Sequence, residues 1–151
     1  MCTANSSTLN PQLDKSVLIM NKNELEIRAS IRELQAKMLA APEEIKLKLE
    51  PEHSFIDGFY LRKLILPPGA VVVGGTHKKD HILVIGKGRC TMINEQGVHE
   101  IKGPKMFLSK RGTKRAFKAW QLGCDIVTIH PNPSNTRDVE KLEKELIEEN
   151  L

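Results

Sequence analysis

Two histidines, His77 and His81, have the residue type and spacing of a chemical site. They lie in the segment 74–88 (GGTHKKDHILVIGKG). If residues 79–85 form an extended strand, the two histidines have the same parity and point to the same face of it. In a small β-barrel, that face is the interior or the mouth. Two imidazoles that converge there are the usual beginning of a transition-metal site. A polar ligand site without metal, and purely structural histidines, are the alternatives.

Four further basic residues are candidates for the same region: Lys78, Lys114, Arg115 and His130. His130 stands at a strand end and could be a third metal ligand, although histidines there also hold turns and interfaces. Lys114 and Arg115 are suited to binding a phosphate or a carboxylate. The guanidinium of Arg115 can donate two hydrogen bonds to one anion. A structural ion pair with the acidic C-terminal segment is the alternative for both.

Charge is distributed unevenly along the chain, whose formal net charge is +4. Residues 62–118 contain 13 Lys and Arg against three acidic residues, whereas both flanking segments are net acidic. A basic centre attracts anions such as phosphates or nucleotides. Nucleic acid fits the charge as well but is not favoured. Neutralisation by the acidic flanks is the alternative.

The length of 151 residues suffices for one domain with a modest core. No apolar run approaches the roughly 20 residues that a membrane helix needs. The three cysteines, Cys2, Cys90 and Cys124, show no CxxC spacing. This argues against a disulfide framework and favours a reducing cytoplasm.

The sequence divides into four segments. Residues 1–22 are rich in Ser, Thr and Asn and predict a disordered leader. Residues 23–42 predict a helix with Asn23 as its cap and one apolar stripe, which docks against the rest of the protein or a partner chain. Residues 43–133 contain short apolar runs between turn signals, which indicate strands of a jelly roll. Residues 134–151 predict a second helix, capped by Asn135 or Thr136.

The expected strands begin with an alternating run at 45–49, followed by apolar runs at 59–66, 70–73, 82–85, 90–93, 106–108 and 126–129. Turn signals between them include Gly86-Lys87-Gly88, which we interpret as the end of one strand and the start of another. The predicted fold is therefore mainly β, with one helix before the barrel and one after it.

The segment around the histidines resembles the first motif of the cupins, which has a His-x-His pair, a Glu and a closing Gly. His77 falls on the second His of this motif, His81 on the Glu and Gly88 on the Gly, whereas Gly75 stands where the first His would be. The resemblance implies a cupin-like double-stranded β-helix, or jelly-roll barrel. Because cupins commonly hold a divalent ion here, zinc, manganese or iron is the implied cofactor.

The second cupin motif, Gly…Pro-x-Gly-x-x-His, resembles the stretch from Gly97 to Arg115. Arg115 stands where the motif has its metal-binding His. The resemblance places Arg115 on the barrel lining near the two histidines, and it predicts a cation where a ligand usually lies.

A closer resemblance, from about residue 43 to 146, is to uncharacterised cupin-like proteins of tailed bacteriophages and prophages. It rests on residues 58–62 (GFYLR), Pro67, Gly69, Gly75, His77-Lys78, His81-Ile82, Gly88, Ser109-Lys110, residues 112–115 (GTKR), residues 129–131 (IHP), Val139-Glu140 and Leu142-Glu143. It implies a phage origin but carries no established activity. The expected location is the cytoplasm of the bacterial host, or the virion.

These observations favour binding of a small anionic ligand, such as a nucleotide or another phosphorylated metabolite, by His77, Lys78, His81, Lys114 and Arg115. A metal-dependent enzyme that uses His77, His81 and His130 is the second hypothesis. A structural or assembly role with other phage proteins is the third. The sequence names no reaction. We also expect a homo-oligomer, since a small barrel leaves sheet edges and the first helix has a long apolar stripe.

Overall fold

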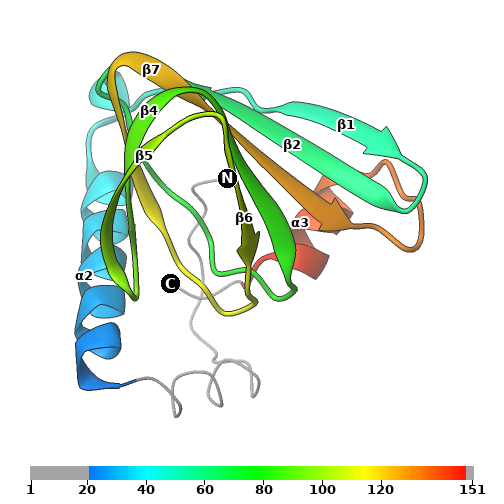
Figure 1. The fold of residues 1–151 in the computed structure, drawn as a ribbon, viewed down its shortest axis with the longest axis horizontal. Coiled ribbons are helices and arrows are strands. Elements are labelled where there is room, and N and C mark those ends of the chain that lie inside the picture. The colour runs from blue at the N-terminus through cyan, green and yellow to red at the C-terminus, as the bar shows by residue number, and fades with distance from the viewer. Residues whose placement is uncertain (1–20, 149–151) are drawn as a thin grey trace.

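The computed structural model describes residues 21–148. All but the last two residues of the expected leader 1–22 lie outside this range. Figure 1 shows a β-barrel with one helix along its side and a second beneath its open end. The elements are α2 (Lys22–Ala40), the short 3-10 helix η1 (Glu43–Ile45), β1 (Glu52–Ile56), β2 (Phe59–Leu66), β3 (Val71–Val73), β4 (His81–Asn94), β5 (Gly97–Lys102), β6 (Lys105–Ser109), β7 (Ala116–Pro131) and α3 (Val139–Leu146).

All strand pairs of the barrel are antiparallel, in the order β1-β2-β7-β4-β5, with β3 on β7 and β6 on β4. The fold is mainly β. It is a jelly-roll barrel with one helix before it in the chain and one after it, as the sequence predicts. Strands β4 and β7 pair along two stretches separated by register shifts. The first half of β4 also pairs with β6 and its second half with β5.

The interpretation of Gly86-Lys87-Gly88 as a turn is wrong, because β4 runs through it as one bent strand. The register with β7 shifts on either side of Gly88. Gly88 has a φ of +93°, and a Cβ on it would lie 2.1 Å from the carbonyl oxygen of Gly123. Only glycine fits a backbone that turns left-handed against a neighbouring strand, so this residue permits the bend of β4.

The core fills the barrel with residues of one parity from each strand. Along β4 and β7 buried and half-buried residues alternate, as in a sheet with one face inside. The main cluster comprises Leu64, Leu66, Ala70, Val72, Leu83, Ile85, Cys90, Met92, Ile101, Phe117, Ala119, Cys124 and Ile126.

Helix α2 uses its apolar stripe to pack on the barrel rather than leaving it free for a partner chain. Ile31 is buried against Val73 and Ala116, and the neighbouring stripe residues join the same cluster. The predicted cap Asn23 is wrong, since Asn21 is the N-cap and forms a capping box with Glu24. The helix therefore begins within the segment that we expected to be leader.

Two other expected elements differ. Residues 45–49 alternate in polarity but form no strand, because no neighbouring strand pairs with them and β1 begins only after Pro51. The second helix is shorter than its charge pattern predicts. It runs from Val139 to Leu146, and Asp138 caps it by accepting a hydrogen bond from the Lys141 amide, in place of Asn135 or Thr136. No helix within residues 21–148 is long and apolar enough to cross a membrane.

A buried ion pair fixes α2 to the barrel. The Arg28 guanidinium donates two hydrogen bonds, of 3.0 and 2.8 Å, to one carboxylate oxygen of Glu95. That oxygen also accepts from the Lys114 amide at 2.9 Å, and Arg28 donates to the carbonyl of Gly112. Both side chains of the pair are 2% exposed. The network thus connects α2, the end of β4 and the loop before β7.

Glu95→Gln should reduce the free energy of unfolding by about 3–5 kcal/mol, because it leaves the Arg28 charge buried without a counterion. Urea unfolding followed by circular dichroism measures this. Glu33→Gln is the matched control, since it removes an exposed pair with Lys37 on the same helix and should change stability little. Equal effects of the two substitutions would show that the buried pair has no special role in docking α2.

Candidate functional site

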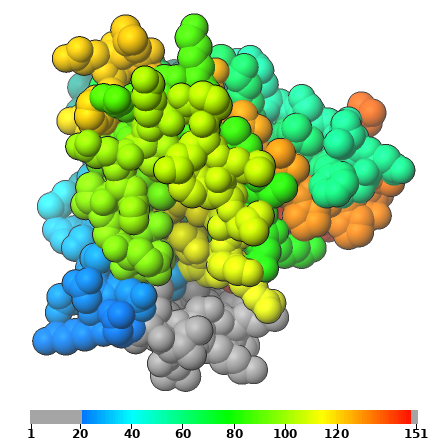
Figure 2. Space-filling view, in the orientation of Figure 1, coloured from blue at the N-terminus to red at the C-terminus, as the bar shows by residue number. Residues whose placement is uncertain are grey.

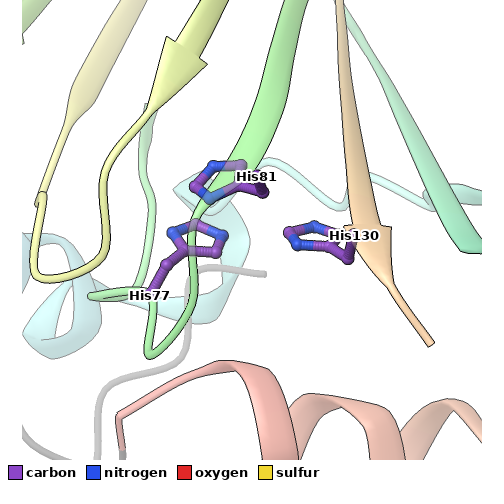
Figure 3. Close-up of side chains that lie close together, drawn as sticks. All are labelled: His77, His81 and His130. Atoms are coloured by element: carbon purple, nitrogen blue, oxygen red, sulfur yellow. The ribbon is translucent and has the colours of Figure 1, made fainter. Parts of the chain in front are cut away.

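The structure brings three histidines together at one end of the barrel: His77, His81 and His130 (Figure 3). One ring nitrogen from each lies within 4.8 Å of the others. The ring centroids are 4.1 Å apart for His77 and His81, 5.3 Å for His77 and His130, and 5.0 Å for His81 and His130. The expected convergence of His77 and His81 is observed, and His130, the candidate third ligand, lies beside them.

Different elements supply the three rings. His81 begins β4 and His130 lies near the end of β7, so both point inward by strand parity. Strand β4 begins at His81 and not at residue 79, where we expected it to begin. His77 therefore lies in the loop before the strand, and strand parity does not set its direction. Its backbone instead forms an isolated antiparallel bridge with Ile147, after α3.

The C-terminal segment closes this end of the barrel. The Lys78 amide donates to the carbonyl of Leu146, and the Glu148 amide to that of Thr76, both at 2.8 Å. A Cβ on Gly75 would lie 2.4 Å from Cγ2 of Ile147. The position where the cupin motif has its first histidine is therefore packed under the C-terminal segment and has no room for a side chain.

All three histidines are nearly inaccessible to solvent, with exposures of 5% for His77, 5% for His81 and 2% for His130. Within residues 21–148, neither ring nitrogen of His77 has a hydrogen-bond partner. A buried polar group without a partner reduces the free energy of unfolding by about 1–3 kcal/mol. A bound species that interacts with the lone pair of the ring would remove this cost.

Hydrogen bonds fix the ring of His81 on both sides. Its Nδ1 lies 3.2 Å from the carbonyl oxygen of Lys79, to which it can only donate. In the neutral ring Nε2 then carries the lone pair, which accepts a hydrogen bond of 2.9 Å from Arg115. The other terminal nitrogen of Arg115 donates to the hydroxyl of Ser109. Arg115 therefore lines the barrel beside the histidines, where the motif match placed it.

His130 is held by contacts on two sides. Its Nε2 is 2.9 Å from the hydroxyl of Thr128, and its ring stacks on Tyr60 with centroids 5.8 Å apart. Next to them, Arg62 forms an ion pair of 2.9 Å with Glu143 of α3. Arg62 thus takes the acidic partner in α3 that we considered for Arg115.

Burial lowers the pKa of every histidine in the cluster, and neighbouring positive charge lowers it further. For His81 desolvation and then Arg115 bring the pKa to about 4. For His130 desolvation, His81 and the two arginines bring it to about 3, and the pKa of His77 lies well below its usual value for similar reasons. All three rings are therefore neutral near pH 7, the form that coordinates metals. Desolvation also lowers the pKa of Arg115, to about 10, so it stays charged.

Two of the expected ligand-binding residues lie away from the cluster. The Lys78 ammonium donates to the carbonyl of Lys144, at the end of α3. Lys114 is fully buried, and its ammonium donates to the carbonyl of Gly74. Conversely, sequence reasoning missed Ser109 and Thr128, which hold Arg115 and His130. Their inward parity on β6 and β7 was one available signal, and Ser109 also belongs to the stretch that resembles the phage cupin-like proteins.

Comparisons with known proteins agree with the fold. No model of a protein family matches the sequence, and no curated protein matches it. Among solved structures, plu4264 from Photorhabdus luminescens is similar with a TM-score of 0.51 and 12% identity, over 63% of this chain and 85% of that one. KdgF from Halomonas sp. has a TM-score of 0.50 and 13% identity, over 61% and 83%. A cupin 2 conserved barrel domain protein from Salinispora arenicola has a TM-score of 0.49 and 10% identity, over 69% and 93%.

The fold is a cupin-like jelly-roll barrel. At such low identities the similarity concerns the fold alone. The site has to be argued from this chain's own residues.

Because the buried histidines are neutral in the folded protein, the free energy of unfolding should decrease as the pH decreases. The unfolded chain takes up protons as the pH falls through about 6.5, whereas folded His81 and His130 do so only near 4 and 3. Between pH 7 and pH 5, in the presence of a chelator, each should cost the fold about 2 kcal/mol. Urea unfolding at both pH values measures this. His81→Gln should remove about one histidine's share, and an unchanged pH dependence would contradict the assignment.

Proposed function

We propose that the protein binds a divalent transition-metal ion, such as zinc, manganese or iron, through His77, His81 and His130. The observation that carries the proposal is that, among the residues that the structure describes, both nitrogens of the buried His77 lack a hydrogen-bond partner beside two other neutral imidazoles. A metal ion would take the lone pair of His77, which no group among residues 21–148 uses. The sequence motif and the barrel fold support the same site.

The donor set fits such an ion. Three neutral imidazoles are a ligand set found in catalytic zinc sites, which leave other coordination positions open. His81 donates its other ring N–H to a backbone carbonyl, an arrangement that orients many metal-binding histidines. Its Nε2 would exchange the hydrogen bond from Arg115 for the metal. When bound, the ion would supply Lewis acidity to an oxygen of a second ligand.

Arg115 supports an anionic second ligand. No carboxylate among residues 21–148 forms an ion pair with its guanidinium, although it is buried. A metal cation next to this charge would be repelled unless a negative group lay between them. We therefore propose that a carboxylate or phosphate of a small ligand binds between the metal and Arg115, with Ser109 holding the guanidinium in place.

This proposal keeps the anionic ligand that the sequence favours and adds the metal as its partner. Phage origin and a host-cytoplasm location stay predictions supported by sequence resemblance and composition. A role in phage particles has no particular observation in the fold that favours it.

Protein purified without a histidine tag should contain about one metal ion per chain, or take one up from zinc, manganese or iron after stripping. Elemental analysis after dialysis measures the ratio. His77→Ala should lower metal affinity at least 10- to 100-fold, because one of three ligands is lost. His99→Ala, on β5 outside the cluster, is the control and should leave the ratio unchanged. A wild-type ratio near zero after reconstitution would exclude the metal site.

Arg115→Ala should weaken binding of succinate or inorganic phosphate to the metal-loaded protein roughly 10- to 150-fold, the usual value of a hydrogen bond to a charged group. Without anion it should strengthen metal binding, since His81 loses a competing cation. Calorimetry at low salt measures both. The exposed Arg111→Ala is the matched control. Unchanged anion affinity in Arg115→Ala would mean that this arginine serves only to hold His81 and Ser109.

A further inference from the structure

The outer face of the barrel wall that carries His81 and His130 is apolar. On β2, β4 and β7 the residues that alternate with the inward ones are half-buried or exposed. They include Ile82 and Ile129, each next in sequence to a histidine of the site. On a sheet with one solvated face these positions are normally polar, so this pattern needs an explanation.

The strand register arranges these residues in rows across four neighbouring strands, β2, β7, β4 and β6. One complete row is Leu61, Ile129, Ile82 and Leu108. The next is Lys63, Val127, Val84 and Met106. Phe59 and Pro131 continue the face on one side and Ile65 and Asp125 on the other. We call these twelve residues the outer apolar face.

No part of the chain between residues 21 and 148 forms a hydrophobic cluster with this face. Helix α2 packs on Val73 and Ala116, and α3 packs on the inward side chain of Tyr60. Leu108 is 80% exposed and Met106 is 66% exposed, values that are unusual for two large apolar side chains in one strand. Figure 2 shows the strands of this wall at the surface of the molecule.

The face is large enough to form the centre of a dimer interface. Twelve positions, each about 4.8 Å by about 7 Å, cover roughly 400 Å². The largest apolar patch on a typical single chain has about this size and is often a functional surface. A standard interface buries about 800 Å² on each partner, of which the centre is apolar and the rim polar. The outer apolar face supplies such a centre, and surrounding residues would supply the rim.

A second copy of the chain is the occupant that the charges favour. The face contains one lysine, Lys63, and one aspartate, Asp125, so it is neutral overall and gives a charged partner no complement. An identical apolar face complements it, since two sheets pack aligned with their side chains interdigitated. A two-fold axis closes the contact and leaves no second face exposed.

We propose that the protein is a homodimer in which the outer apolar faces of two copies pack against each other. This places the interface on strands β2, β7, β4 and β6, and not on α2, whose stripe packs on its own barrel. The proposal does not depend on a metal or an anion in the site.

Light scattering coupled to size exclusion tests the proposal on the full chain at about 50 µM. The wild type should have twice the chain mass of 17.0 kDa. Leu108→Glu and Met106→Glu should each give a monomer, because a carboxylate would be buried against an apolar partner. Leu122→Glu is the matched control. Leu122 is 93% exposed on β7 outside the face, and its variant should stay a dimer.

Circular dichroism of each variant checks that the barrel is folded, which is expected because the substituted side chains are exposed. A wild-type monomer at this concentration would overturn the proposal. So would a dimer that survives both face substitutions, or one that Leu122→Glu dissociates equally well. Heterodimer formation with another protein by a monomeric wild type would also overturn it.

Discussion

The pairing of β4 with β7 determines where most of the important side chains of this protein lie. Ile82 is opposite Ile129, and this register turns the adjacent His81 and His130 inward together. A slip of one residue in either strand would exchange the two faces of that strand and move its imidazole to the surface. The same pairing directs Leu83 and Ile85 into the core and the outer apolar face away from it. One backbone register thus positions the site, the core and the proposed interface.

The buried polar side chains at the histidine end of the barrel are stabilised by several independent contacts. Burying imidazoles and guanidinium groups is costly unless they are hydrogen-bonded or neutral. Ser109 and Thr128 supply hydroxyls, Glu143 pairs with Arg62, and the C-terminal segment excludes water. Among the histidines of residues 21–148, His77 is the one without a hydrogen-bond partner at either ring nitrogen. A bound ion would satisfy the ring nitrogen of His77 that carries the lone pair.

Much of the fold follows from sequence patterns, and the failures have physical reasons. The jelly roll, both helices and the convergence of three histidines were predicted, since apolar period, turn residues and parity are local signals. Strands β1 and β5 were missed because their alternating residues are largely exposed and polar. The false strand at 45–49 had the right alternation but no partner strand. Arg62, which pairs with α3, and the closure by Ile147 depend on contacts across the whole chain, which no local pattern specifies.

The central claim is that His77, His81 and His130 together bind one metal ion. X-ray absorption at the zinc edge of the zinc-loaded, untagged protein tests it most directly. The account predicts three imidazole nitrogens at about 2.0–2.1 Å, completed by oxygen, and the loss of one imidazole in His130→Ala. A first shell without imidazole, or one unchanged by that substitution, would contradict it.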